Sequence, residues 1–220
     1  MRAHDAEAVG AGLAASPQLL GCRNQRGYGW LHLCCSVDIG KPGRSAAASI
    51  ATAEALAEAG LGIDDVAFFE GEWRATPLWC AIGRGRNLAL AEWLLRRGCN
   101  PNYSLYAAAF RDDFAAIRLL CRYGAEVDDR SAGETPFLGA VASSHFAAAE
   151  VLLELGADID AIAPDGRTGL HMMLAKGSDP DWIVRVVGRG AGLDIPDRSG
   201  ATARAMLARK KEPRLRRLAG

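Results

Sequence analysis

The chain has 220 residues, half of them hydrophobic, and its 26 basic and 26 acidic side chains give a formal net charge of zero. This composition suffices for one folded unit or a short array of smaller ones, and it gives no overall attraction to nucleic acid or to an anionic membrane. Residues 1–12 contain Asp5 and Glu7 and no long apolar run, so we expect no secretory signal, and no stretch is apolar enough to cross a bilayer.

A glycine followed four residues later by Asp or Asn recurs along the chain, at separations of 38, 26, 32 and 34 residues. An apolar helical pattern precedes each glycine, as at 91–95 and 117–120. Glycine can take the left-handed conformation that follows the last turn of a helix, so each occurrence predicts a helix end. The five occurrences run from Gly60 to Asp64, Gly98 to Asn102, Gly124 to Asp128, Gly156 to Asp160 and Gly190 to Asp194.

A second pattern marks the beginnings of helices. Thr-Pro followed by apolar residues occurs at 76–79 and 135–138, and Thr-Gly-Leu-His occurs at 168–171. Weaker forms lie at 29–32 and 200–202. A threonine hydroxyl caps a helix, and proline at the first helical position leaves no amide hydrogen unused. The repeated unit is therefore a projecting loop, a helix, a short connection, a second helix and a glycine stop.

This combination resembles the ankyrin repeat, which opens on Thr-Pro-Leu-His and ends on Gly-Ala-Asp-x-Asn/Asp at a period of about 33 residues. The resemblance covers about residues 6–215 and implies an all-α ankyrin-repeat solenoid of stacked helix-turn-helix units. Short fingers, the loops that join one repeat to the next, complete each unit. We expect about ten to twelve helices and no continuous sheet.

The expected elements follow one another in a single ankyrin-repeat domain, residues 1–220, with about five to six repeats. The first is an N-terminal half-repeat at about 5–23, and the last is a C-terminal capping unit at about 197–220. Between them we expect a finger at 24–29, a helix at 31–36, its partner at 45–59, and repeats opening at Thr76, near Ser104, at Thr135 and at Thr168.

Two departures interrupt the period. Between the helix beginnings at Gly29 and Thr76 lie 47 residues, about 14 more than one repeat. The surplus falls at 37–44, where two glycines and a proline predict a loop. Loop length costs little free energy, which favours a tolerated surface insertion over a dedicated contact loop.

The second departure is a deletion at 100–109, where the chain passes directly from a repeat ending into the next helix. The finger of this repeat is missing or very short. We expect the gap to open the groove locally and to expose Tyr103 and Tyr106. The gap either forms a pocket or is a variation found in the family that has no functional consequence.

Candidate catalytic and metal-binding residues have simpler interpretations. His32 and His171 stand at the histidine position of the helix opening, where the resemblance implies a structural hydrogen bond. His145 follows Ser143 and Ser144, but no oxyanion donor or orienting acid accompanies this pair. The six cysteines show no Cys-x-x-Cys pair and no regular metal spacing. We therefore expect no enzyme, no cofactor, no metal and reduced thiols in a cytoplasmic protein. Abundant arginine, alanine and glycine favour a bacterial source.

The ankyrin register places Arg84, Arg111 and Lys176 on one ridge along the concave face. Glutamates of the outer helices, such as Glu54 and Glu150, fall on the opposite face. We therefore expect a basic groove and a more acidic back. Each recognisable finger also carries an arginine, namely Arg26, Arg74, Arg130, Arg167 and Arg198.

A protein–protein interaction module (scaffold, adaptor or inhibitor) is the function that the resemblance implies. We expect a monomer that binds a protein with an acidic surface through the groove and finger tips, with no membrane partner. The alternative is nucleic-acid or other polyanion binding through the arginine-rich groove and the basic C-terminal helix. Trp73 beside Arg74 has the composition of an interface anchor, although Trp73 has the alternative of folding back onto the neighbouring finger. The expected contact residues are Trp73, Arg74, Trp79, Arg84, Tyr103, Tyr106, Phe110, Arg111, Arg130, Arg167 and Lys176.

Overall fold

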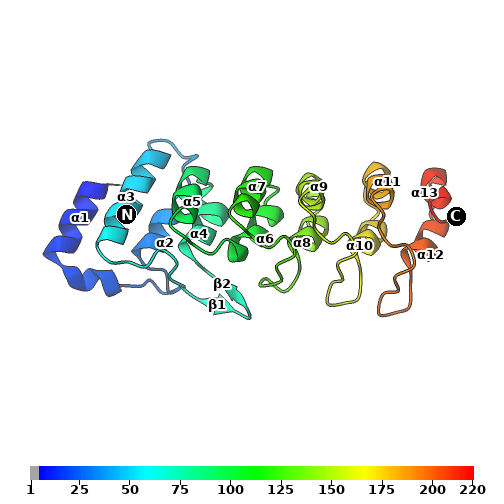
Figure 1. The fold of residues 1–220 in the computed structure, drawn as a ribbon, viewed down its shortest axis with the longest axis horizontal. Helices are drawn as coiled ribbons and strands as arrows, with labels where there is room; N and C mark the ends of the chain where they lie inside the picture. The colour runs from blue at the N-terminus through cyan, green and yellow to red at the C-terminus, as the bar shows by residue number, and fades with distance from the viewer. Residues whose placement is uncertain (1–4) are drawn as a thin grey trace.

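The computed structural model describes residues 5–220, so residues 1–4 of the segment considered for a secretory signal lie outside it. Pairs of helices stack side by side from α1 at one end to α13 at the other, and the fingers project from one side of the stack (Figure 1). Each inner helix contacts the inner helix of the next repeat, and neighbouring outer helices pack likewise. This nearest-neighbour packing is the architecture of a solenoid. None of the helices in residues 5–220 is long and apolar enough to cross a bilayer.

The helices form an inner row next to the fingers and an outer row behind it. The inner row contains α2 (Trp30–Cys35), α4 (Pro77–Cys80) with its π-helical continuation η2 (Ala81–Gly85), α6 (Asn102–Phe110), α8 (Pro136–Ala142), α10 (Gly169–Lys176) and α12 (Ala203–Ala208). The outer row contains α1 (Ala6–Ala15) with the 3₁₀ helix η1 (Pro17–Gly21), α3 (Ala46–Glu58), α5 (Leu88–Leu95), α7 (Phe114–Arg122), α9 (Phe146–Glu154), α11 (Pro180–Gly188) and α13 (Pro213–Arg217).

The predicted helix beginnings are N-caps in the structure. Thr76 Oγ1 accepts a hydrogen bond from the Trp79 N–H at 3.2 Å, and Thr135 Oγ1 accepts one from the Leu138 N–H at 3.3 Å. Thr168 forms a capping box with His171. These threonines are almost fully buried, so each hydroxyl satisfies an amide that water cannot reach.

The predicted repeat endings join one repeat to the next. The five glycines that end the helices have φ between +87° and +100°, the left-handed region in which a side chain is strained. The Asp or Asn that follows accepts a hydrogen bond from a backbone N–H one repeat further along. The pairs are Asp64 with Asn100 (3.2 Å), Asn102 with Glu126 (2.9 Å), Asp128 with Asp158 (3.0 Å) and Asp160 with Gly192 (2.7 Å).

The C-terminal unit contains two short helices where one basic helix was expected. Lys210 to Glu212 break the helical hydrogen bonding, and Pro213 begins α13 with Glu212 as its N-cap. Proline fits the first position of a new helix but not the interior of a continuing one. Residues 5–220 consequently contain 13 α-helices, one more than the upper expectation.

The surplus in the second repeat is distributed over three places, not over 37–44 alone. Residues 37–44 do form a loop, and the Ile39 N–H donates to the Gly85 carbonyl at 3.2 Å. Helix α3 has 13 residues, against 8 or 9 in the next four outer helices. The following finger also carries a hairpin of β1 (Phe69–Glu70) and β2 (Trp73–Arg74). The longer α3 and the hairpin only lengthen a helix and a finger that every repeat has. The spacing of the repeats therefore does not reveal where these extra residues lie.

Candidate functional site

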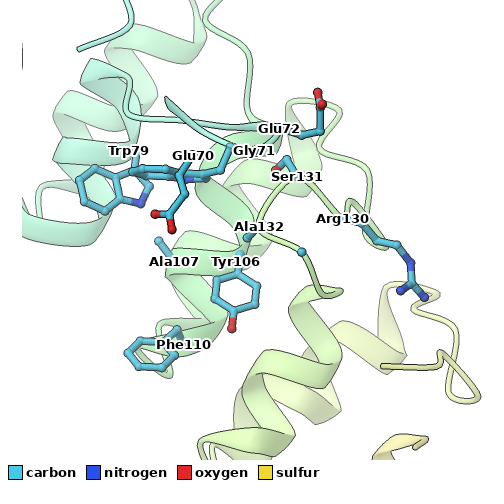
Figure 2. A pocket seen from close by; sticks show the side chains of 12 residues that line it. Glu70, Gly71, Glu72, Trp79, Tyr106, Ala107, Phe110, Arg130, Ser131 and Ala132 are labelled. Atoms are coloured by element: carbon cyan, nitrogen blue, oxygen red, sulfur yellow. The ribbon is translucent and has the colours of Figure 1, made fainter. Parts of the chain in front are cut away.

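The missing finger leaves a hollow on the concave side of the stack. The chain runs from the end of α5 directly into α6, so no finger projects between the β1–β2 hairpin and the finger at 129–134 (Figure 1). The hollow has a volume of about 600 Å³. It is lined by Glu70, Gly71, Glu72, Trp73, Trp79, Tyr106, Ala107, Phe110, Arg130, Ser131, Ala132 and Gly133 (Figure 2).

Four of the residues that line the hollow are aromatic. The rings of Trp73 and Trp79 meet edge to face with centroids 5.0 Å apart, and those of Tyr106 and Phe110 stack at 6.4 Å. The side chain of Phe110 is 53% exposed, which is high for so large an apolar group. Partial burial raises the pKa of the Tyr106 phenol, so this group stays neutral at physiological pH. Tyr103 is half-buried at the edge of the gap and lines an adjacent, more polar hollow.

Trp73 folds back onto the neighbouring repeat instead of standing at the finger tip. Its indole Nε1–H donates to the Tyr103 carbonyl oxygen at 3.2 Å, and its ring packs against Phe68 at 5.3 Å. In the hairpin Glu70 pairs with Trp73, and Phe69 pairs with Arg74. Paired residues share one face of an antiparallel ribbon, so Arg74 lies on the opposite face, with its guanidinium 5.2 Å from the Phe69 ring. Of the two alternatives for Trp73, the structure therefore shows the one in which the indole folds back.

A second hollow of about 440 Å³ adjoins the first, and Trp79 contributes to both. The guanidinium of Arg84 lies 5.2 Å from the Tyr28 ring centroid and 5.8 Å from that of Trp79. Burial raises the pKa of the Tyr28 phenol. The two hollows therefore meet at Trp79, and aromatic residues line both of them.

The comparisons with known proteins agree with this architecture. Residues 78–163 match the family model described as ankyrin repeats (3 copies). The ankyrin repeat domain of human ASB11 superimposes with a TM-score of 0.69 and 24% sequence identity, over 97% of this chain and 95% of that domain. Residues 78–163 are ankyrin repeats, and the whole chain has the ankyrin-repeat fold.

The basic ridge of the ankyrin array lies at the carboxyl ends of inner helices. Arg84 is in η2, Arg111 follows α6 directly and Lys176 ends α10; all three side chains are exposed. The Lys176 ammonium donates to the Ala142 carbonyl of the preceding inner helix. Within residues 5–220 none of these three cations forms an ion pair with a carboxylate.

The finger arginines of the ankyrin array differ from one another. Arg130 is exposed, and its guanidinium donates to the Ile162 carbonyl of the next finger at 3.0 Å. Arg167 is held by Asp165 of its own finger, with 2.7 Å between Nε and Oδ2. Arg26 lines the second hollow. Of these three, Arg167 alone forms an ion pair with a carboxylate of residues 5–220.

The back of the ankyrin array is electrically balanced and not acidic, contrary to expectation. Each of several outer-helix glutamates pairs with an arginine, often from the adjacent repeat. Such exposed pairs contribute little stability, but they cancel the charge of the glutamates. The pairs are Glu54 with Arg97 (3.1 Å), Glu92 with Arg96 (3.0 Å), Glu154 with Arg118 (2.7 Å), and Glu150 with Arg185 (3.1 Å) and Arg189 (3.3 Å).

The histidines tie the ankyrin fingers to the helices. His32 Nε2 donates to the carbonyls of Asp65 and Ala75 at 2.9 and 3.2 Å, and burial lowers its pKa. His171 accepts the Thr168 N–H at Nδ1 and donates from Nε2 to the Ala201 carbonyl. Within residues 5–220 no three His, Cys, Asp or Glu side chains gather as metal ligands. Burial raises the pKa of the Cys99 thiol to about 12, which leaves it unreactive.

Three of the C-terminal basic residues, Arg204, Lys210 and Arg214, are used within the ankyrin fold. Arg204 pairs with Asp194 at 2.7 Å and also donates to the Ala219 carbonyl. Arg214 pairs with Asp181 at 2.9 Å, and Lys210 donates to the Leu174 carbonyl at 2.6 Å. These contacts dock the closing unit on α10 and α11 and do not favour a nucleic-acid interface.

Sequence reasoning missed several residues of the ankyrin groove, above all Glu70, Tyr28 and Phe68. Glu70 ends β1, directly before a two-residue hairpin turn whose first position, Gly71, has φ +56°. A glycine between alternating apolar and polar residues is the pattern of such a turn, so the sequence contained a usable signal. Tyr28 and Phe68 carry no comparable signal, because their place in the groove depends on packing between fingers.

Proposed function

We propose that this protein is a non-catalytic protein–protein interaction module, a scaffold, adaptor or inhibitor. Ankyrin repeats in general mediate protein–protein interactions. The partner is held in the concave groove and against the finger tips. The contact residues are Trp73, Arg74, Trp79, Arg84, Tyr103, Tyr106, Phe110, Arg111, Arg130, Arg167 and Lys176.

The contrast between the two faces of the array supports this proposal. Five arginines in or next to the outer helices α5, α7 and α11 are matched by glutamates, although Arg122 of α7 is not. On the groove side Arg84, Arg111 and Lys176 all lack an ion pair within residues 5–220. Unmatched cations beside an exposed aromatic surface favour a protein with acidic side chains as the partner. The aromatic rings supply buried area on binding, and the cations set orientation and association rate.

The proposed state is a cytoplasmic monomer. The thiols of Cys80 and Cys99 are buried, and burial raises their pKa to about 11 and about 12, which suits a protein that keeps its cysteines reduced. The C-terminal unit presents exposed Arg209, Arg216 and Arg217, a charged surface that disfavours stacking on a second copy of the chain.

A charge-reversal variant with Arg84→Glu, Arg111→Glu and Lys176→Glu tests the proposal. Wild type and variant are immobilised and compared for capture of proteins from a lysate of the producing cells, with quantification by mass spectrometry. We expect a specific protein to be retained by the wild type and reduced at least about tenfold by the variant, since like charges replace complementary ones.

A matched control carries the same charge change elsewhere, with Arg122→Glu, Arg216→Glu and Arg217→Glu at exposed positions of the outer helices. This control should retain the partner as the wild type does. Equal retention by all three proteins would contradict binding through the groove. Circular dichroism and melting curves establish that both variants are folded.

A further inference from the structure

The carboxylate of Glu70 faces the aromatic hollow. Glu70 is paired with Trp73 across the hairpin, so both side chains lie on the face that meets Trp79. Figure 2 shows the Glu70 carboxylate directed into the hollow, whereas Glu72 is directed away from it. Within residues 5–220, Glu70 forms no ion pair. An exposed negative charge therefore stands beside aromatic rings.

Elsewhere in this protein, an aromatic ring and a carboxylate placed side by side bind an arginine side chain. On the outer face, Arg97 lies 3.8 Å from the Trp93 ring centroid and pairs with Glu54 of the preceding repeat at 3.1 Å. An indole face attracts a guanidinium, and a carboxylate completes its coordination by charge-assisted hydrogen bonds. The arrangement occurs a second time with Trp182, Glu150 and Arg185, at 4.9 and 3.1 Å.

We propose that the hollow is a receptor for one arginine side chain of the bound protein, held between the rings of Trp73, Trp79 and Tyr106 with its guanidinium on Glu70. This inference rests on the proposed function, because the arginine belongs to the partner that occupies the groove. The partner surface then combines acidic residues opposite Arg84 and Arg111 with a single arginine opposite Glu70.

The cations that line or adjoin the hollow leave this position open. The Arg130 guanidinium donates to Ile162 at 3.0 Å and points away from the rings in Figure 2. Arg84 lies in the adjoining hollow, between Tyr28 and Trp79. The volume of about 600 Å³ accommodates an extended side chain with part of its backbone. Arginine fits better than lysine, since a planar guanidinium both stacks on indole and meets a carboxylate with two hydrogen bonds.

The probe is Nα-acetyl-arginine methylamide, titrated into protein carrying ¹⁵N-labelled tryptophan. The indole N–H resonances of Trp73 and Trp79 are assigned with Trp→Phe variants and followed by NMR. We expect saturable shifts of these two resonances and no shift of those of Trp93 and Trp182, which already hold arginines. The citrulline analogue, of the same shape but neutral, should bind about tenfold more weakly, and the lysine analogue should also bind more weakly.

Glu70→Gln and Glu72→Gln form a matched pair on the same hairpin. Glu70→Gln should weaken the arginine probe about five- to tenfold. Glu72→Gln, at the rim of the hollow with its carboxylate directed away, should weaken it less than about twofold. Equal binding of arginine and citrulline, equal affinity of the wild type and Glu70→Gln, or no shift at saturating probe would each overturn the inference. A failed titration beside successful capture by the wild type would refute this receptor alone; a successful titration without capture would refute the proposed function alone.

Discussion

His32 shows at the scale of one residue how the repeat chemistry serves the fold. Its ring is buried at the start of an inner helix, and its Nε2–H donates to two carbonyls of the following finger. A charged imidazole would lose solvation in this place, so burial lowers the pKa of His32. The neutral ring is the form that the native state requires.

The free energy of unfolding should therefore fall on mild acidification. His32 takes up a proton in the unfolded chain near its ordinary pKa of about 6.5, but only at lower pH in the folded chain. Its stabilising contribution is complete above the unfolded pKa and is lost as the pH falls through the lowered folded value. Urea unfolding between pH 7.5 and 5.5 measures this loss. His32→Gln should be less stable throughout and should show a flatter pH dependence; an unchanged slope would contradict the assignment.

Asp128 illustrates the links between repeats. Its carboxylate accepts the Asp158 N–H of the next repeat at 3.0 Å. Asp128→Ala should destabilise the protein by about 1 kcal/mol, because an amide in the repeat junction loses its acceptor. Asp128→Asn keeps an acceptor oxygen and should cost less than half as much. Urea midpoints compare the two, and equal losses would show that the hydrogen bond is not the cause.

Residues whose role depends on local backbone were predictable. The glycine stops and the capping threonines, such as Gly124 and Thr135, act within a few residues of themselves. The pairing of Glu54 with Arg97 was not predictable, because it joins positions 43 residues apart. The prediction of an acidic back was wrong for this reason. The glutamates can be read from the sequence, but the arginines that pair with them across repeats cannot.

The β1–β2 hairpin is the element that shapes the candidate site. Trp73 connects it to α6 by the hydrogen bond to Tyr103 and to α4 by the contact with Trp79. The base of the hairpin is closed by two backbone hydrogen bonds of 2.9 Å, which join Ala75 to residues 67 and 68. The finger therefore lies against the gap that the next, missing finger leaves.

Trp73→Ala should detach the hairpin without unfolding the array. In the wild type, local opening of the hairpin requires the aromatic contacts of Trp73 to be broken. Without them we expect the backbone amide of Ala75 to exchange with deuterium at least about tenfold faster. Amides of α8 and α10 should be unaffected. Trp182→Ala is the control, since this indole packs on Phe146 at the outer face. Unchanged exchange at Ala75 would mean that the hairpin is held by its backbone alone.

At this scale the spacing of the glycines predicted the missing finger, since 26 residues leave no room for one. The hollow at that place is one of the two outcomes that the spacing left open. Its aromatic and acidic lining does not follow from spacing, because the hairpin that brings Glu70 and Trp73 into it arises from a local addition to the preceding finger.

The whole molecule has two unlike faces. Ion pairs between repeats balance the outer face, and the inner face combines exposed rings with cations that no carboxylate of residues 5–220 matches. The outer pairs offset charge on the back, whereas the cations of the groove stay available to a partner. We therefore propose that the partner binds in the groove and not on the back.

Site-specific photo-crosslinking tests that claim most directly. A benzoylphenylalanine replaces Phe110 in the groove or Arg122 at the exposed end of α7, and the protein is irradiated in the producing cells. We predict a discrete covalent adduct with another protein from position 110 and none from position 122. An adduct from position 122 alone, or equal adducts from both positions, would contradict binding in the groove.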